Sequence, residues 1–158
     1  MIRIIAVGKI KEKFYEDAMA EYAKRLSAYV KLGIIQVADE KCPESLSLKQ
    51  EELVMEKEGE RILKNIRDND YVVTLEINGT QKSSEDFADL IHSLEVSGHP
   101  DITFVIGGSL GLSAEVRKRS DMALSFSKMT FPHQLMRVVL MEQIYRAYKI
   151  NRGEPYHK

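Results

Sequence analysis

The sequence has little that could cross-link the chain or bind a metal. It contains one cysteine, Cys42, and no tryptophan. A single cysteine excludes an intramolecular disulfide framework and any zinc site built from several cysteines. The four histidines have no metal-ligand spacing; they are His92, His99, His133 and His157. We therefore expect no metal cofactor.

Long hydrophobic runs are absent as well. No apolar stretch approaches the roughly 20 residues that are needed to span a bilayer. The opening segment is only briefly apolar before Lys9, Lys11 and Lys13, and it has no small-residue cleavage site. It does not read as a secretory signal. We therefore expect a cytoplasmic protein.

Charge of either sign is not in excess over the whole chain, because the net charge is −1. The distribution is uneven, however. Residues 116–158 hold nine Lys or Arg against three Asp or Glu, a balance of +6, and residues 1–115 carry −7. A basic end on an acidic body is the asymmetry expected if one face meets phosphate. Two solvated helix faces would give the same counts, so charge alone leaves both interpretations open.

Short apolar runs alternate with amphipathic stretches along the 158 residues, which we expect to form one domain over residues 1–158. The runs are rich in Ile and Val, as in strands that are buried on both faces. The stretches between them carry apolar residues at helical spacing. This pattern predicts an α/β fold with a largely parallel sheet flanked by helices. The expected strands are residues 2–7, 34–37, 71–77, 102–106 and 123–126.

Turn and cap residues set the expected boundaries. Gly33 should end the first helix, whose apolar stripe runs from Phe14 to Tyr29, and residues 48–66 should form a charged helix with one apolar face. Asn78-Gly79 is a strong turn signal that should end the third strand. Three further signals concern the later helices: Ser83 or Ser84 as an N-cap, Ser113 as an N-cap, and Gly98 to Pro100 as a helix stop.

The last predicted helix, residues 133–148, is apolar on nearly all sides. A terminal helix with two apolar faces needs two partners. One of them is the sheet, and the other would naturally be a second subunit. The closing Pro155-Tyr156-His157 is unusual for a frayed tail, because aromatic residues suggest docking, although termini do often fray.

A glycine-rich turn follows the fourth strand and leads into a helix. Gly107 to Gly111 matches G-x-S-x-G, the nucleophile elbow of α/β hydrolases, and Asp121 followed by His133 or His157 has the matching chain order. The chain is short for that fold. The same glycines could admit a nucleoside-like ligand, although they form neither a dinucleotide fingerprint nor a P-loop. A tight turn without a ligand is the third interpretation.

Four segments resemble the RlmH family of SPOUT-class methyltransferases. Residues 104–112 read FVIGGSLGL, residues 124–137 read LSFSKMTFPHQLMR, residues 142–147 read EQIYRA, and the chain closes on Pro155-Tyr156-His157. The opening residues 6–13, AVGKIKEK, are also similar to the family's start. The resemblance therefore covers essentially the whole chain, and its motifs are much longer than G-x-S-x-G.

The resemblance implies a SPOUT fold with a C-terminal trefoil knot, a homodimer, and methyl transfer from S-adenosylmethionine. The implied target is N3 of a pseudouridine in the 23S ribosomal RNA hairpin at the subunit interface, in assembled ribosomes. The implied catalytic residues are Tyr156 and His157, and Arg137 and Arg152 would contact RNA phosphates. The implied cofactor residues are Leu75, Gly107, Phe126, Ser127, Lys128, Met129, Thr130 and Phe131. The alternatives are a small α/β serine hydrolase that uses Ser109 and a non-catalytic ribosome-binding dimer.

Overall fold

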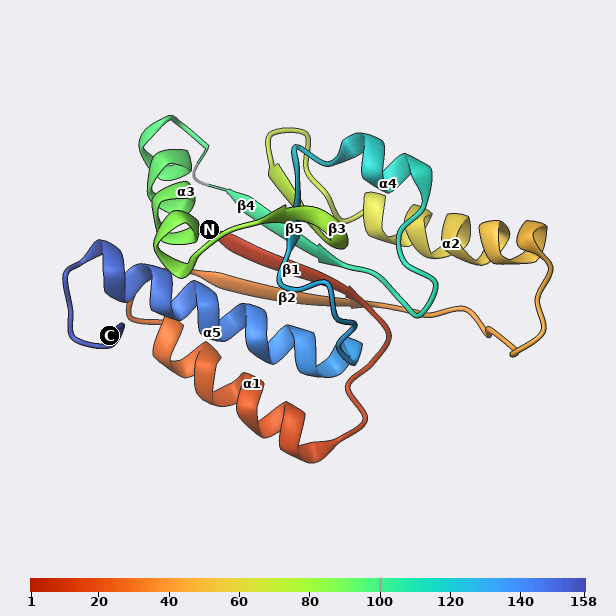
Figure 1. Ribbon diagram of the computed structural model, residues 1–158, viewed down its shortest axis with the longest axis horizontal. Helices are drawn as coiled ribbons and strands as arrows, with labels where there is room; N and C mark the ends of the chain where they lie inside the picture. Colours follow the sequence, from red (N-terminus) through yellow and green to blue (C-terminus); the bar gives the residue numbers. More distant parts are fainter. Residues whose placement is uncertain (100) are drawn as a thin grey trace.

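Five parallel strands form the sheet at the centre of the computed structural model, which describes residues 1–99 and 101–158 (Figure 1). The strands are β1 (Ile2–Val7), β2 (Leu32–Val37), β3 (Tyr71–Gln81), β4 (Ile102–Ile106) and β5 (Met122–Ser125). Their order across the sheet is β2-β1-β4-β3-β5, and every pairing is parallel. The predicted α/β class with a parallel sheet is confirmed.

Five helices cover the two faces of the sheet in the described part of the chain. The helices α1 (Lys13–Leu26), α3 (Ser84–Val96) and α5 (His133–Asn151) pack on one face, with Ile4 of β1 and Phe104 of β4 among the side chains beneath them. The helices α2 (Leu48–Leu63) and α4 (Ala114–Arg119) cover the other face, above Ile5 and Val105. Neighbouring residues of one strand thus enter opposite cores, which is why these strands are apolar throughout.

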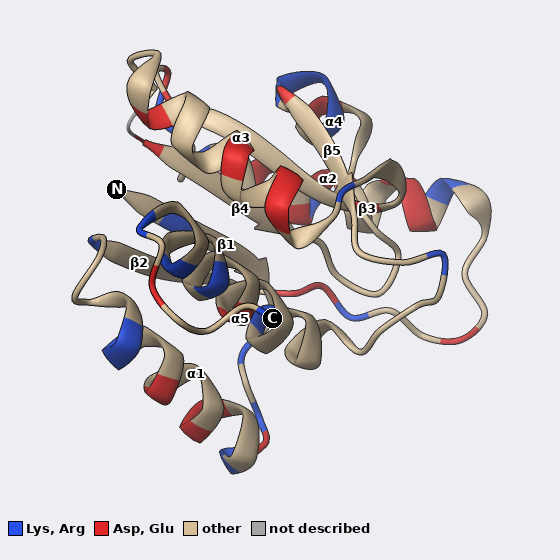
Figure 2. Ribbon diagram, turned by 60° about the vertical axis from the view of Figure 1, so that its left-hand side comes forward, with Lys and Arg blue, Asp and Glu red and all other residues tan. Residues whose placement is uncertain are grey.

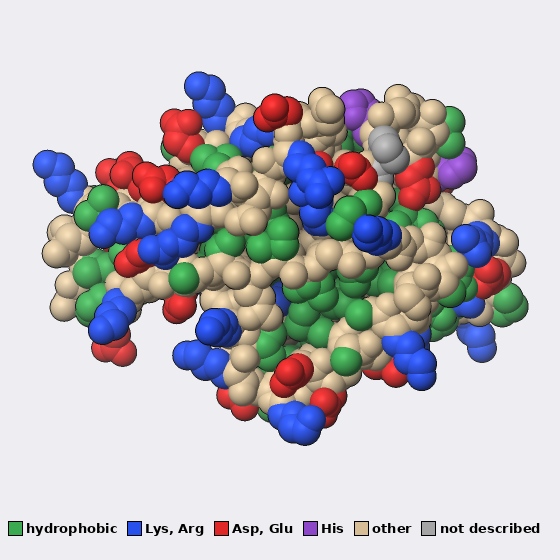
Figure 3. Space-filling view, turned by 180° about the vertical axis from the view of Figure 1, so that it is seen from behind, with side chains coloured by type: hydrophobic (Ala, Val, Ile, Leu, Met, Phe, Trp, Pro, Cys, Tyr) green, Lys and Arg blue, Asp and Glu red, His purple; other side chains and the backbone are tan. Residues whose placement is uncertain are grey.

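The serine caps confirm several predicted helix starts. Ser83 and Ser113 accept hydrogen bonds from the backbone N–H groups of Asp86 and Val116. α2 is packed on one side and charged on the other: it lies at the right in Figure 1 and at the left in Figure 3, where its Lys, Arg, Asp and Glu side chains form a band. The helix stop expected at Pro100 lies outside the described residues.

The first predicted helix ends earlier than expected. α1 stops at Leu26, the last buried residue on its stripe, and Gly33 instead lies within β2, opposite Arg3 of β1. Tyr29 follows the helix and packs against Tyr145 and Tyr148 of α5. The prediction of a helix up to Gly33 was wrong because the apolar stripe continues into a turn that packs on the same core.

The third strand does not end at Asn78-Gly79. β3 continues to Gln81, and its pairing with β5 shifts register between Leu75 and Thr80. A Cβ on Gly79 would lie 2.8 Å from the backbone of Ala123, so glycine is required here because β5 passes close by. The dipeptide marks an irregularity within a strand rather than a turn that ends it.

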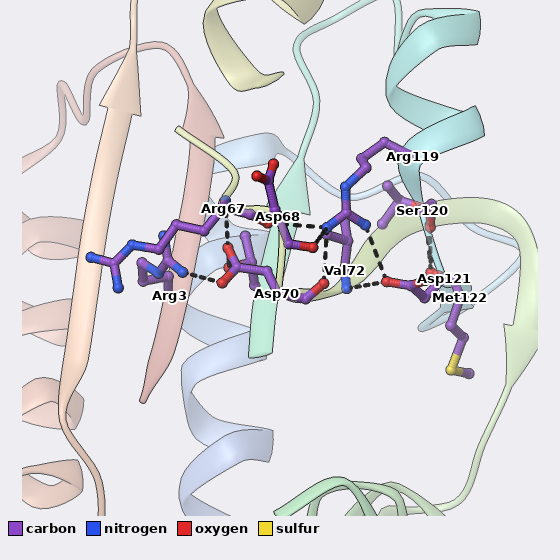
Figure 4. Close-up of polar contacts among 11 residues, drawn as sticks. Arg3, Arg67, Asp68, Asp70, Val72, Arg119, Ser120, Asp121 and Met122 are labelled. Carbon is purple, nitrogen blue, oxygen red and sulfur yellow. Dashed lines mark hydrogen bonds and ion pairs between the residues drawn. The ribbon is translucent and has the colours of Figure 1, made fainter. Parts of the chain in front are cut away.

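A polar network closes the amino edge of the sheet (Figure 4). The carboxylate of Asp70 is paired with buried Arg3 and accepts hydrogen bonds from the Arg67 backbone N–H and the Thr103 hydroxyl, each at 2.9 Å. Nearby, Arg119 donates to three backbone carbonyls of residues 67, 68 and 70. Except for the buried Nε of Arg3, the groups named here have partners within the fold, so we interpret this edge as structural.

Candidate functional site

A cavity of about 480 Å³ lies at the opposite edge, beyond the carboxyl ends of β3, β4 and β5. Ligands of open parallel α/β sheets bind at this edge, and the volume is within the range of small-molecule sites. Three segments supply most of the lining: the glycine turn after β4, the irregular part of β3, and the loop after β5. The lining residues include Leu75, Glu76, Asn78, Ile106, Gly107, Gly108, Leu110, Leu124, Phe126, Ser127, Thr130, Phe131, His133 and Met136.

The glycine turn brings the backbone close to the cavity. A Cβ on Gly107 would lie 3.0 Å from the carbonyl carbon of Gly111 and from Leu112 Cδ2. Gly111 has φ +91°, a conformation that favours glycine, and its N–H donates to the Gly108 carbonyl at 3.1 Å. The turn is therefore compact, with no room for a side chain at Gly107, and Gly107 itself lines the cavity.

The register shift in β3 supplies a second wall. Residues 76–79 leave the regular pairing with β5, and Glu76, Ile77 and Asn78 line the cavity. The carboxylate of Glu76 accepts a hydrogen bond from the Thr74 hydroxyl at 2.8 Å and pairs with Arg117 at 2.9 Å. An acidic group is therefore held at the rim by a neighbour on each side.

The loop after β5, residues 126–131, is shaped by serine hydroxyls. The single hydroxyl proton of Ser125 is shared between the Ile77 carbonyl at 2.8 Å and the Ser127 carbonyl at 3.1 Å. The Ser127 hydroxyl accepts from the Met129 backbone N–H at 3.0 Å. These bonds tie the loop to the irregular part of β3, so the two walls keep a fixed separation.

The first turn of α5 adds a histidine to the cavity. His133 is half-buried and lines the wall together with Met136. Burial, and then the nearby Arg137 guanidinium, lower the pKa of His133 below its ordinary value. The imidazole is therefore neutral at pH 7 and able to accept a proton.

The structure brings together the residues that were predicted to bind a cofactor. All of them line the cavity except Lys128, whose side chain is exposed beside it. The sequence reading missed Glu76, Asn78 and Arg117. Only the Asn78-Gly79 dipeptide hinted at them, and it was interpreted as a turn.

The hydrolase triad is not assembled. Ser109 lines the cavity, but Asp121 lies at the amino edge, where its carboxylate accepts the Val72 N–H at 2.8 Å and pairs with Arg119 (Figure 4). Among the described residues, no hydrogen bond joins Ser109 to a histidine. The motif therefore serves the tight turn and the cavity wall, and the serine hydrolase alternative has no geometric support.

The C-terminal tail is docked rather than frayed. The Tyr156 hydroxyl donates to Glu142 at 3.1 Å, and its ring packs edge-on against Tyr145 with 4.9 Å between centroids. His157 contacts Arg146 through Nδ1 at 3.1 Å and Glu85 through Nε2 at 2.8 Å. Tyr156 and His157 therefore lie against the middle of α5, and neither belongs to the cavity lining of its own chain.

The surroundings of Tyr156 and His157 determine where each side chain carries its proton. Burial, followed by the hydrogen bond to Glu142, raises the pKa of Tyr156 to about 12. Tyr156 is therefore a proton donor at neutral pH. A guanidinium is always a donor, so the contact with Arg146 makes Nδ1 of His157 an acceptor and leaves the proton on Nε2.

The two arginines that were predicted to contact phosphate differ in their exposure to solvent. Arg152 is exposed, with its guanidinium 4.5 Å from the centroid of the Tyr29 ring. Arg137 is only 1% exposed, and its Nη2 donates to the carbonyls of Val7 and Gly8. The guanidinium of Arg137 is thus held inside this chain, and its contact with RNA stays a prediction.

Comparison with known proteins links this geometry to one family. A family model described as "Predicted SPOUT methyltransferase" matches residues 1–157. Proteins of Clostridium botulinum and Clostridium acetobutylicum are each 59% identical to the chain over 157 residues, which is 99% of both sequences. A protein of Lactobacillus helveticus matches at the same identity and coverage. All three are called "Ribosomal RNA large subunit methyltransferase H".

Among solved structures, a probable methylase family protein from Haemophilus influenzae has a similar fold. The TM-score is 0.53 at 15% identity, over 99% of this chain and 70% of that one. The described residues contain no group of three or more His, Cys, Asp or Glu that could hold a metal ion, and no helix among them is long and apolar enough to cross a membrane.

Proposed function

This chain belongs to the SPOUT methyltransferase family, and on that premise we propose that it transfers the methyl group of S-adenosylmethionine to large-subunit ribosomal RNA. The observation that carries the proposal is the cavity at the carboxyl edge, because two of its walls, the glycine turn after β4 and the loop after β5, lie in segments that resemble the family's motifs. The finer target, N3 of a pseudouridine in the 23S hairpin at the subunit interface of assembled ribosomes, rests on the resemblance. A ribosomal substrate implies work in the cytoplasm.

The cavity suits S-adenosylmethionine. The bare backbone of Gly107 and the loop after β5 offer N–H and carbonyl groups to the polar edge of an adenine. Leu75, Ile106 and Leu124 provide apolar walls for its faces. The carboxylate of Glu76 can accept hydrogen bonds from hydroxyl groups. When bound, the cofactor would supply a methyl group that is already activated as a sulfonium.

Positioning would then account for most of the rate acceleration. Holding two reactants in line can lower a barrier by about 7 to 11 kcal/mol. The N3–H of the base must also lose its proton, so that its electron pair forms the new bond to the methyl carbon while the old bond's pair stays on sulfur. Catalysis by a general base typically increases the reaction rate by about 10²- to 10⁴-fold.

Two sites offer groups for that proton transfer. His133 lies in the cavity wall and is neutral at pH 7. We assign the tail a role in the partner's site of a homodimer, because it does not reach the cavity of its own chain. There Tyr156 would donate a hydrogen bond to the base, and His157 would position the base or accept its proton. The homodimer and the trefoil knot both rest on the family resemblance.

Calorimetric titration with S-adenosylmethionine tests the cofactor assignment. We expect saturable binding by the wild type and an affinity loss of about tenfold or more, equal to about 1.4 kcal/mol, in two variants. Gly107→Val places a side chain in the compact turn. Thr130→Trp fills the mouth of the cavity from an exposed position, and Ser45→Trp, on an exposed loop outside the cavity lining, is the matched control.

A transfer assay with ribosomes that lack the modification tests the reaction. Labelled methyl groups should enter large-subunit RNA with the wild type and with Ser45→Trp, but not with Thr130→Trp. Cofactor binding without transfer to any ribosomal RNA would refute the proposed substrate. Full transfer by Thr130→Trp would refute the assignment of the cavity.

A further inference from the structure

The C-terminal charge balance translates only in part into free positive surface. Four of its basic residues are in ion pairs: Arg117 with Glu76, Arg119 with Asp121, Arg146 with Glu142, and Lys149 with Glu154. A fifth, Arg137, is buried. The remaining four, Lys118, Lys128, Arg152 and Lys158, are exposed. An enzyme that acts on RNA needs cations that can meet phosphate, and exposed lysines elsewhere at the carboxyl edge would add to these four.

The loop between β1 and α1, residues 8–12, leaves the sheet at the same carboxyl edge as the cavity (Figure 1). Lys9 and Lys11 in this loop are exposed, and neither side chain has a hydrogen-bond or ion-pair partner among the described residues. Lys13 follows, in an exposed pair with Asp17 that contributes little. Figure 2 shows these basic positions, broken by acidic Glu12, along the chain that enters α1.

The loop is fixed against the first turns of α5. Arg137 Nη2 donates to the carbonyls of Val7 and Gly8 at 2.8 and 2.9 Å, and the Lys11 backbone N–H donates to the Gln134 side chain at 2.9 Å. Gly8 has φ +88°, which permits the sharp departure from β1. Because Gln134 lies between the cavity residues His133 and Met136 in sequence, the loop sits beside the cavity wall.

Arg137 also gives this region a positive field. Its Nε and Nη1 atoms are buried without a hydrogen-bond partner, and no acidic side chain in the described chain pairs with it. Burial lowers its pKa, yet a guanidinium keeps its proton in proteins. A buried cation without an acidic partner therefore lies against the backbone that leads into Lys9, and together with the exposed lysines it favours an anion at the surface.

We infer that residues 8–12 form a contact for RNA phosphate, in which Lys9 and Lys11 hold the backbone of the substrate beside the mouth of the cavity. The inference rests on the proposed function and adds the surface that the RNA meets. Arg137 and Gln134 act as positioning residues, because they set the place of the loop. Phosphate contacts carry no sequence information, so Lys9 and Lys11 would contribute affinity and orientation.

The test is the double variant Lys9→Gln/Lys11→Gln, with Lys49→Gln/Lys57→Gln as the matched control. The control removes two exposed, unpaired lysines from α2. Affinity for purified large ribosomal subunits is measured by sedimentation over a series of salt concentrations. We expect the double variant to bind more weakly and the slope of log affinity against log salt to fall by about 2, about one for each lysine. The control should keep the wild-type slope, and calorimetry should give both variants the wild-type affinity for S-adenosylmethionine.

The binding measurement separates this inference from the proposed function. A double variant that keeps wild-type affinity and salt slope overturns the inference, even if methyl transfer is intact. An equal loss in the control variant also overturns it, because the effect would then be general charge. If the wild type binds subunits through these lysines but transfers no methyl group, the contact stands and the proposed reaction fails.

Discussion

Glu58 brings a carboxylate into the interior beside the glycine turn. It is 4% exposed, and its Oε2 accepts the Glu40 backbone N–H at 3.0 Å. A Cβ on Gly108 would lie 2.9 Å from Glu58 Oε1, so the two positions are packed against each other. Burial raises the pKa of Glu58, and the neighbouring acids Asp39 and Glu40 add to the increase, while the hydrogen bond from Glu40 and the charge of Arg61 oppose it.

Because its pKa is raised, Glu58 lowers the free energy of unfolding by an amount that depends on pH. A carboxyl group whose pKa is higher in the folded state favours folding when protonated, and that contribution is lost as pH rises through the folded pKa. At pH 7 the charged form is therefore buried at a cost. Glu58→Gln should raise the free energy of unfolding at pH 7, and its advantage should shrink toward pH 4. Urea unfolding at both pH values measures this, with Glu56→Gln, an exposed position on the same helix, as the control. An advantage that is independent of pH would contradict the electrostatic explanation.

Burial of single charged residues is what the sequence does not reveal. Residues 129–145 hold no Lys or Arg besides Arg137, which was expected from the family resemblance to meet RNA, yet the helix turns it toward β1. Glu58 is one of many acids in α2, and nothing in the local pattern separates it from exposed Glu56. Which charged side chain faces inward depends on how α2 and α5 are rotated on the sheet, and this is set by contacts far away in sequence.

At the scale of elements, most strands and helices followed from apolar runs and serine caps, and the differences arose at their ends. β4 and the start of α5 were predicted to the residue. The errors at Gly33 and at Asn78-Gly79 both involve a glycine that was read as a breaker but lies within a strand. At Gly79 the glycine permits the close approach of β5, which is distant in sequence. The irregular part of β3 was missed for this reason, and with it went Glu76 and Asn78, which complete the cavity.

The network at the amino edge binds several of these elements together. Asp70 precedes β3, Arg3 lies in β1 and Thr103 in β4. The side chains of Arg3 and Asp70 are 5% and 1% exposed, so this is a buried pair. Removing one member of a buried pair leaves the other charge without compensation and costs about 3 to 5 kcal/mol.

Asp70→Ala should therefore lower the free energy of unfolding by about 3 to 5 kcal/mol. Chemical denaturation measures the change, and Asp68→Ala is the control. Asp68 is exposed and takes part through its backbone carbonyl, so its substitution should stay within about 0.5 kcal/mol of the wild type. The folded fraction of Asp70→Ala should bind S-adenosylmethionine normally, since the cavity lies at the other edge. A large loss of cofactor affinity with little loss of stability would contradict the structural role.

At the scale of the whole molecule, the two ends of α5 have different roles, one at the cavity and one at the C-terminal tail. Its first turns line the cavity, and its later turns hold the tail through Glu142 and Arg146. α1 and α3 flank the helix within the same chain and take up part of the surface that was expected to meet a second subunit, while Leu135 and Val139 stay partly exposed. If Tyr156 and His157 serve the reaction, they must therefore do so in another copy of the chain.

Mixing two defective subunits tests this arrangement. A chain that ends at Glu154 keeps its cavity but lacks the tail, and we expect its kcat to fall by about 10²- to 10⁴-fold, the usual contribution of general-base catalysis, with cofactor binding retained. Thr130→Trp keeps the tail but has a blocked cavity. In a mixed dimer the intact cavity of one subunit would meet the intact tail of the other. Random assortment should then restore about a quarter of wild-type transfer, because half of the dimers carry one complete site of two. If each chain used its own tail, no mixture of the two variants would recover activity.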